Sequence, residues 1–559
     1  MSHRAVVTRC GSAQDASMRF VRGSALRWGM SFALLLPVIG LYACEYLRGG
    51  FTGFIQYDQP SYMAHAQKFF EGGFHFLYGN SFSPDPKTPA IYFQIHLLGL
   101  GFLQAITGCD PGLLYVIFGF FAALICVRVA MALYEQVAGL GTRAEWAGLV
   151  LFIWGGGVLA MVGLGFHLLQ RSNVQTTLTD LFHFDPAQGW WFLNLGRNLV
   201  FPTEAYYHAL AFGAVLMAMR SNFRAALWLA FILSLSHPFT GLQFLLILLA
   251  WCWWEMGFLG NRTIPFTFPA MLFGILTFHL AYNVVLLNLF PEHRVLFVQW
   301  SHVWLDPVSA FLPADIFVGF LAWRAMRNWK LAAELFCSPA NRLLLTWFVV
   351  SFILVHHDLV TTPRQPIHFS RGYTWVPLFL LGVQPLLRML ESCFSQKSRI
   401  LRVATIGFVF LIGLSDNLAW FGLHAAMALA PRWGITWLPE DGFRLSAADR
   451  QLYGWLRQRP VPHDELLVTP DSDSSVVYLA MVYTDYRAWY SHFDLTPFAN
   501  QRKQELADFF QTETVPSGWR GRTILLIVPK ADPYDYGGNL ASPILYENDG
   551  YRVRMLQVQ

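Results

Sequence analysis

Charge is what this sequence lacks most. Asp, Glu, Lys and Arg make up only 13% of its 559 residues, while hydrophobic residues make up 55% and the mean hydropathy is +0.39. Soluble globular domains carry about 25% charged residues. The composition therefore excludes an ordinary soluble enzyme and predicts a protein with many membrane-spanning helices.

Basic clusters and cysteine motifs are also scarce. The net charge is only +4 and no dense run of Lys and Arg occurs, which excludes a nucleic-acid-binding protein. None of the seven cysteines follows Cys393, and none belongs to a CxxC motif or a Cys/His pair. We therefore expect no disulfide framework in the C-terminal part and no structural zinc site.

Hydrophobic segments fill most of the chain up to residue 424. Residues 1–28 carry five arginines against one acid, so the positive-inside rule predicts a cytoplasmic N-terminus. The segment that follows, 29–47, has no small-x-small cleavage site and is expected to remain as an anchor. We predict a polytopic α-helical membrane domain over residues 29–424, with about 11–13 membrane segments.

The direction of the early segments is left open by the charges. If Arg143, Arg220, Arg262 and the later basic clusters all lie in the cytoplasm, up-and-down counting works from residue 204 onward and fails before it. Either segment 90–107 is re-entrant or Arg143 lies outside. A half-crossing segment is tolerated only where it lines protein or a water-filled cavity, so both alternatives suggest a cavity.

A polar stretch interrupts the apolar sequence between residues 56 and 92, within a loop that we place at 48–90. It holds Asp58, His65, Asp85 and Lys87 between two apolar segments. Ionisable groups beside a membrane are costly to desolvate, so their clustering predicts a functional site, although an ordinary solvated loop would also be polar. A helix in this loop would place Asp58 and His65, seven residues apart, on one face.

This loop resembles the first extracytoplasmic loop of the GT-C superfamily, integral membrane glycosyltransferases that use polyprenyl- or dolichyl-phosphate sugars. Asp58 matches the acidic residue that follows the first membrane helix in that superfamily. The sequence Asp85-Pro86-Lys87-Thr88-Pro89 matches loosely the second motif, in which acid and base are adjacent and a proline pair follows. The resemblance implies a transferase of a bacterial inner membrane that acts on its periplasmic side.

The implied reaction displaces a polyprenyl phosphate from the anomeric carbon of a sugar by an acceptor hydroxyl. We assign Asp58 as the base that deprotonates the acceptor, and we expect nearby lipid to raise its pKa. Asp85 is a second catalytic carboxylate, which orients the acceptor or binds a divalent cation, Mg²⁺ or Mn²⁺, together with Asp58. Lys87 is assigned to the donor phosphate. The donor sugar and the acceptor, whether glycan, lipid or protein, are not specified by the sequence.

Three later loops supply further site residues. Arg364 and Arg371, seven apart, are predicted to bind the donor phosphate by charge-assisted hydrogen bonds. His237, before a proline between two apolar runs, is assigned to the same phosphate, although a hydrogen-bonded histidine at a helix kink is the alternative. The polar loop 170–204 is either an aromatic girdle or part of an acceptor and sugar site, whose residues we assign together with His65 as Asp180, Asp185 and Trp190.

The composition changes at about residue 445. Helical patterns at 446–457, 474–482 and 499–510 alternate with strand-like patterns at 466–469, 523–528 and 551–557, which predicts an extracytoplasmic α/β domain over 445–559. No Gly-rich phosphate loop or nucleophile elbow occurs in it, so we expect a lid or an acceptor-recognition module. Its last residues resemble the closing hairpin of C-terminal domains in GT-C-like bacterial proteins.

Two other functions are compatible with the sequence. A transporter or flippase of a lipid-linked or anionic substrate would also need broken membrane helices, but it predicts internal repeats, and none is evident. A catalytically silent GT-C-like assembly protein would keep the fold without the chemistry. Dependence of activity on a lipid-linked sugar distinguishes the transferase from both.

Overall fold

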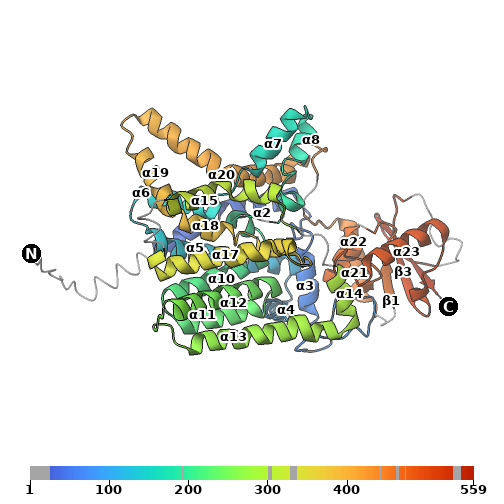
Figure 1. Ribbon diagram of the computed structural model, residues 1–559. Coiled ribbons are helices and arrows are strands. Elements are labelled where there is room, and N and C mark those ends of the chain that lie inside the picture. The colour runs from blue at the N-terminus through green and yellow to red at the C-terminus, as the bar shows by residue number, and fades with distance from the viewer. Residues whose placement is uncertain are drawn as a thin grey trace, which may run out of the picture.

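The computed structural model describes residues 25–191, 193–299, 305–327, 336–439, 442–460, 465–472, 474–532 and 543–558. A bundle of helices is followed by a small α/β domain that covers one end of it (Figure 1). We call this end the domain end and the opposite one the distal end. Residues 1–24, on which the predicted cytoplasmic terminus depends, lie outside the described residues.

Five described helices are long and apolar enough to cross a membrane by themselves. They are α5 (Pro111–Ala138), α12 with the π-helix η2 (Pro238–Phe258), α13 with η3 and η4 (Thr267–Leu289), α15 (Val308–Arg327) and α20 with η7 (Arg399–Trp433). Shorter helices of the bundle are α4 (Ile95–Thr107), α10 (Pro202–Met219), α11 (Phe223–Ser234) and α17 (Pro339–Val355). The chain is a multi-pass helical membrane protein.

Three further spans are bent pairs of helices. They are Ala25–Leu34 with α2 (Leu36–Arg48), bent by 48°, α6 (Arg143–Trp154) with α7 (Leu159–Leu169), bent by 63°, and α18 (Trp375–Leu381) with α19 (Val383–Phe394), bent by 61°. Glycines permit the last two bends. A Cβ on Gly157 would lie 2.1 Å from the Pro313 carbonyl oxygen, and one on Gly382 would lie 2.6 Å from the Leu321 Cβ.

The charges at the distal end resolve the direction of the early segments. Arg220, at the end of α10, donates a hydrogen bond to Gln136 near the end of α5 (3.3 Å), and Arg27 pairs with Glu135. Helix α6 begins at Arg143, five residues after α5 ends. Arg143 therefore lies with the other arginines at the distal end.

Helix α4 does not cross the bundle. Its first residue, Ile95, donates to the carbonyl of Leu235 at the domain end (3.2 Å). The helix that follows it starts beside Thr52, whose carbonyl oxygen lies 1.6 Å from where a Cβ on Gly112 would stand. Segment 90–107 thus begins and ends at the domain end, which is the re-entrant alternative.

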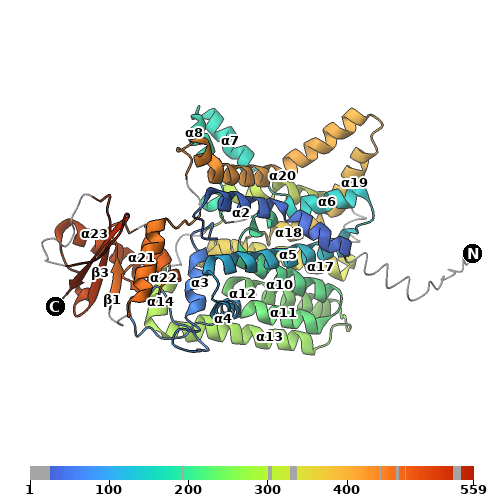
Figure 2. The same ribbon diagram turned by 180° about the vertical axis from the view of Figure 1, so that it is seen from behind.

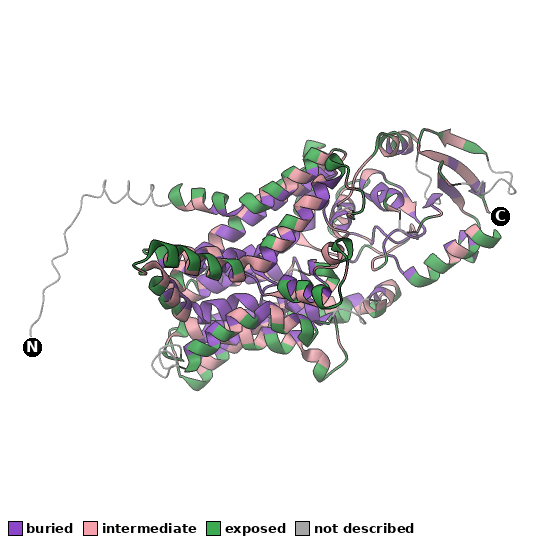
Figure 3. Cartoon of the chain, turned by 90° about the horizontal axis from the view of Figure 1, so that it is seen from above, coloured by how far each residue is buried: buried purple, intermediate pink, exposed green. Residues whose placement is uncertain are grey.

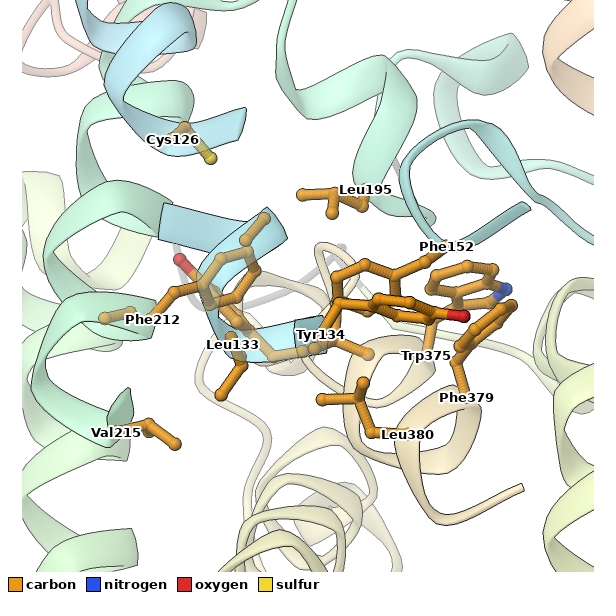
Figure 4. Close-up of a cluster of buried hydrophobic side chains, with 14 of the residues drawn as sticks. Cys126, Leu133, Tyr134, Phe152, Leu195, Phe212, Val215, Trp375, Phe379 and Leu380 are labelled. Carbon is orange, nitrogen blue, oxygen red and sulfur yellow. The ribbon is translucent and has the colours of Figure 1, made fainter. Parts of the chain in front are cut away.

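Large apolar side chains fill the bundle interior. Figure 4 shows Tyr134 of α5, Phe152 of α6, Phe212 of α10 and Trp375 of α18 converging from four helices. Phe152 lies against Phe379 with ring centroids 5.3 Å apart. Away from this interior, the outward faces of the helices are exposed (green in Figure 3), as expected for surfaces that face lipid.

The C-terminal domain is a five-stranded mixed sheet with helices. Its strands β1 (Glu465–Val468), β2 (Arg487–Ala488), β3 (Thr523–Pro529), β4 (Ile544–Glu547) and β5 (Tyr551–Gln557) follow the order β2-β1-β3-β5-β4. The pairs β1/β2 and β1/β3 are parallel, and β3/β5 and β4/β5 are antiparallel. Its helices are α21 (Ala447–Gln458), α22 (Ser475–Tyr483) and α23 (Ala499–Thr512). The predicted α/β domain and its closing hairpin are confirmed.

The domain is joined to the bundle by the predicted polar loop. That loop forms α3 (Gln59–Gln67), whose Gln67 amide donates to the Val482 carbonyl at the end of α22 (2.7 Å). The Tyr478 hydroxyl donates to the Tyr57 carbonyl (2.6 Å). Figures 1 and 2 both show α3 between the bundle and α22. The remaining described short helices are α8 (Val174–Thr179), η1 (Pro186–Gly189), α9 (Leu195–Asn198), α14 (Pro291–Gln299), η5 (His357–Leu359), η6 (Pro366–Phe369) and η8 (Ser517–Trp519).

Candidate active site

A cavity of about 1240 Å³ lies at the domain end, between the bundle and the C-terminal domain. Its wall is built from the polar loop, the break between α11 and α12, the end of α13, helix α14, residues 354–371 and residues 492–495 of the C-terminal domain. Six of the predicted site residues line it: Asp58, His65, Trp190, His237, Arg364 and Arg371. Segments far apart in sequence thus converge on one chamber.

Asp58 and His65 share one wall of the cavity because both belong to the α3 region. Asp58 is the N-cap residue of α3, but its carboxylate caps no backbone N–H and points into the cavity, where 42% of the side chain is accessible. Pro60 follows in the first turn, where a missing N–H costs nothing. His65 follows Asp58 by seven residues. Burial lowers the pKa of His65 to about 4, so its ring is neutral at pH 7.

The surroundings of Asp58 keep its carboxylate ionised. Burial raises its pKa, but contact with His492, the Gln56 amide and the charge of Arg371 lower it more. His492 Nε2 lies 3.4 Å from Asp58 Oδ1, and Gln56 Nε2 lies 3.2 Å from Oδ2. The net pKa lies below the usual value. The predicted increase in the pKa of Asp58 is therefore wrong, because the polar partners outweigh desolvation.

A second carboxylate in the cavity, Asp494, was not predicted. It lies in the loop after β2, and burial together with the negative charge of Asp58 raises its pKa to about 7. The cavity thus holds one carboxylate that is ionised at neutral pH and one that is partly protonated. No motif in the sequence marks His492 or Asp494, since their role depends on a contact with a loop more than 400 positions earlier.

The two predicted arginines have different surroundings. Arg371 is buried, forms an ion pair with the fully buried Glu204 and lies 4.8 Å from the ring centroid of Trp191. Arg364 is exposed, and its guanidinium lies 4.5 Å from the ring centroid of Phe297. Within the described part of the chain, no carboxylate lies within ion-pair distance of Arg364. Its positive charge is therefore available to an anion.

His237 serves both as a helix cap and as a cavity residue. It is the N-cap of α12, and its Nδ1 accepts the backbone N–H of Thr240 (3.1 Å). The neutral ring therefore carries its proton on Nε2. The ring stacks on Tyr207 with centroids 4.6 Å apart and lines the cavity. The two interpretations of this residue, capping histidine and site residue, are thus compatible.

Asp85 and Lys87 are not among the residues that line the cavity. The Arg487 guanidinium donates to the carbonyl of Asp85 (2.7 Å), and the Arg522 guanidinium donates to that of Pro84 (2.8 Å). The carboxylate of Asp85 accepts the backbone N–H of Lys87 (2.9 Å), whose side chain is exposed. The second motif of the loop thus fastens the loop to the C-terminal domain.

Asp180 and Asp185 also lie outside the cavity. Asp180 pairs with His183 beside α8 (2.8 Å). Asp185 and Arg197 form a fully buried ion pair. Of the three residues predicted in loop 170–204, only Trp190 faces the cavity, where its ring lies 4.9 Å from that of His424.

Another part of the cavity wall carries apolar side chains. Phe278, Leu280, Val284 and Leu287 of the α13 to η4 span line it, together with His279, Tyr282, Asn283 and Asn288 of the same span. Phe278 and Val284 are also 52% and 53% exposed, so this part of the wall reaches the outer surface of the bundle. A π-helix at Ala281–Leu286 widens the helix at this point, as π-bulges often do at functional sites.

The divalent cation predicted for Asp58 and Asp85 stays a prediction. Asp58 lines the cavity and Asp85 does not. Among the residues that the structure describes, no group of three or more His, Cys, Asp or Glu side chains is arranged to hold a metal ion.

Comparison with known proteins gives structural similarities only. No protein family model matches the chain, and no curated protein matches its sequence. Among solved structures, ArnT from Cupriavidus metallidurans bound to undecaprenyl phosphate is 13% identical, with a TM-score of 0.42 over 97% of this chain and 98% of that one. The apo form of ArnT gives 13% identity and a TM-score of 0.44, over 94% and 98% of the two chains.

The Archaeoglobus fulgidus oligosaccharyltransferase in its apo form is also similar. It is 12% identical, with a TM-score of 0.39 over 81% of this chain and 64% of that one.

Proposed function

We propose that this protein is a glycosyltransferase that moves a sugar from a polyprenyl-phosphate donor to an acceptor hydroxyl at the domain end. The observation that carries the proposal is the composition of one cavity. It combines an ionised carboxylate, Asp58, with the available cation of Arg364 and with apolar side chains that reach the outer surface of the bundle. These are the three groups that a reaction between a hydroxyl and a lipid-linked phosphate requires.

The apolar wall suits the polyprenyl chain. Phe278 and Val284 both line the cavity and are exposed at the side of the bundle, so a lipid tail lying there would place its phosphate inside the cavity. Arg364 and the Nε2–H of His237 then donate to the phosphate oxygens. Arg371 contributes less net charge, because Glu204 already neutralises it.

The chemical step follows from these positions. Asp58 takes the proton of the acceptor hydroxyl, and the acceptor oxygen bonds to the anomeric carbon of the sugar. The bond between that carbon and the phosphate oxygen breaks, and the electron pair leaves with the polyprenyl phosphate. Asp58 is ionised at neutral pH and so is ready to accept the proton. His65 and Trp190 line the same chamber and are assigned to sugar and acceptor binding.

The charge distribution supports an orientation in the membrane. Arg27, Arg143 and Arg220 lie at the distal end, and the positive-inside rule assigns this end to the cytoplasm. The domain end and its cavity then face the periplasm of a bacterial inner membrane. Lipid-linked sugars displayed on that face are the donors that the cavity can reach.

The test uses the purified protein in lipid nanodiscs with undecaprenyl-phosphate esters of glucose, mannose and arabinose. We expect one ester to raise the melting temperature and to be turned over. Asp58→Asn should keep the stabilisation and lose turnover, whereas Asp180→Asn, a matched substitution outside the cavity, should keep both. Parallel arms with Mg²⁺, Mn²⁺ or EDTA test the cation predicted for Asp58 and Asp85.

Two results would reject the transferase function. If neither the esters nor undecaprenyl phosphate stabilise the protein, it does not bind a polyprenyl-phosphate donor. Uptake of a lipid-linked or anionic substrate into proteoliposomes, without any sugar transfer, would identify the protein as a transporter.

A further inference from the structure

The imidazole of His492 is held in one orientation by its own loop. Its Nδ1 accepts the backbone N–H groups of Asp494 (3.1 Å) and Leu495 (3.2 Å). The hydroxyl oxygen of Thr496 accepts the backbone N–H of His492 (3.1 Å), and the Thr496 N–H returns a hydrogen bond to the His492 carbonyl (3.0 Å). Because Nδ1 accepts two hydrogen bonds, the proton of the neutral ring lies on Nε2.

That N–H lies beside the carboxylate of Asp58. The Nε2 atom is buried, and no hydrogen bond of normal geometry satisfies it within the described residues. The carboxylate oxygen of Asp58, at 3.4 Å, is the acid beside it. A buried imidazole N–H without an acceptor is unfavourable, so a slight approach of the two groups would be favourable.

Aromatic packing keeps the ring aimed at Asp58. The ring of His492 lies 4.8 Å from that of Tyr57, 5.4 Å from Phe82 and 5.3 Å from Tyr478, all measured between centroids. The Tyr478 hydroxyl also binds the carbonyl of Tyr57, the residue before Asp58. The C-terminal domain thus fixes both the backbone before the carboxylate and the donor in front of it.

We infer that His492 is a positioning residue for Asp58, and that the C-terminal domain is therefore part of the catalytic unit. This rests on the proposed transferase function. His492 donates its Nε2–H to Oδ1 of the carboxylate. Oδ2 accepts from Gln56 Nε2 (3.2 Å), and its remaining lone pair faces the acceptor hydroxyl. No proton leaves His492 in the reaction, since its Nδ1 is already occupied by two backbone donors.

The first experiment does not depend on a donor. The carboxyl absorption of Asp58 is titrated by infrared spectroscopy in nanodiscs and assigned by its loss in Asp58→Asn. We expect His492→Ala to raise the apparent pKa of Asp58 by about one unit, because one hydrogen bond to the charged form is lost. His492→Gln, whose amide N–H replaces the donor, should restore it in part.

Other charged groups around Asp58 set the controls. Those that interact with it from neighbouring elements are Arg371, His368, Asp494, Tyr62, Tyr115 and Tyr478. These groups are unchanged in the His492 variants, so a change in the pKa of Asp58 reports the loss of the His492 N–H. His183→Ala removes a histidine paired with an aspartate outside the cavity and should leave the Asp58 titration unaltered. If His492→Ala does not fold, His492→Phe retains the ring packing without the N–H.

The second experiment uses the undecaprenyl-phosphate ester that the wild type turns over. The acid limb of the kcat profile should move to higher pH by the same unit in His492→Ala, with about a tenfold loss of kcat on that limb and an unchanged KM for the donor. An unaltered Asp58 titration in both His492→Ala and His492→Phe would overturn the inference. A shifted titration without turnover of any ester would support the pairing and reject the proposed function.

Discussion

Replacing Arg371 by alanine is expected to destabilise the whole protein rather than to weaken donor binding alone. The guanidinium forms an ion pair with Glu204, whose side chain is fully buried at the start of α10. Removing one partner of a buried pair leaves an uncompensated charge and costs about 3–5 kcal/mol. The sequence alone predicts a loss of donor affinity for Arg371→Ala, and the ion pair now adds a larger structural effect.

Arg364→Ala provides the matched comparison. Arg364 is exposed and has no ion-pair partner in the described part of the chain, so the free energy of unfolding should change by less than about 0.5 kcal/mol. If this guanidinium binds the donor phosphate, its loss removes a charge-assisted interaction worth about 1.5–3 kcal/mol. The Kd for undecaprenyl phosphate should then rise roughly 10- to 150-fold.

The assay measures denaturant unfolding and undecaprenyl phosphate binding on the same nanodisc preparations. Undecaprenol, which lacks the phosphate, serves as the control ligand and should bind both variants as it binds the wild type. The double variant Glu204→Ala/Arg371→Ala removes both charges and should recover part of the stability lost in Arg371→Ala. Wild-type stability in Arg371→Ala, or unchanged phosphate affinity in Arg364→Ala, would refute the reasoning.

Three further predictions address the carboxylates and the loop. Asp58→Asn should lower turnover at least 10²-fold, the usual contribution of a general base, with unchanged unfolding; wild-type turnover would remove Asp58 from the mechanism. Asp494 has its pKa raised to about 7 in the folded protein, against about 4 in an unfolded chain, so it stabilises the fold at low pH and that stability is lost as the pH rises through 7. Asp494→Asn should flatten this part of the unfolding profile measured against pH, and a profile identical to wild type would contradict the assignment. Gly101→Ala should lower the free energy of unfolding, measured with denaturant, by about 1–3 kcal/mol, because its Cβ would lie 2.1 Å from the Ala66 carbonyl oxygen. A Cβ at Gly99 meets nothing within 4 Å, so Gly99→Ala should be neutral. Equal effects of the two substitutions would argue against close packing of α3 on α4.

Most helices and strands followed from local patterns. Long apolar segments and the alternation of helix and strand after residue 445 are set by residues close in sequence, so they were predicted to within a few positions. The bend between α6 and α7 and the bend between α18 and α19 were not predicted. Gly157 and Gly382 permit close contact with α15 at these bends, and the sequence does not show that contact. Strand β2 was missed because its two residues are ordered by parallel pairing with β1.

Topology alone brings some of the proposed site residues together. Asp58, His237 and Arg364 lie in loops at the same end of the bundle and line one cavity, so counting membrane segments places them near one another. Asp185 lies in a loop at the same end, but it does not line the cavity, and its carboxylate forms a buried ion pair with Arg197. A polar loop residue that already has an internal partner has the same sequence signature as one that faces a substrate.

The sequence pattern does not identify His492, and the contact of His492 with Asp58 bears on the role of the C-terminal domain. A domain that served only as a lid would touch the cavity with interchangeable surface residues. Here Tyr478 binds a backbone carbonyl 421 positions away, and the ring of His492 points its remaining donor at the carboxylate that follows that carbonyl. Separation of the domain from the bundle would therefore remove the imidazole that lies 3.4 Å from the Asp58 carboxylate, as well as a wall from the cavity. The domain and the first loop consequently act as one unit, and the second motif of that loop, held by Arg487 and Arg522, is where the unit is fastened.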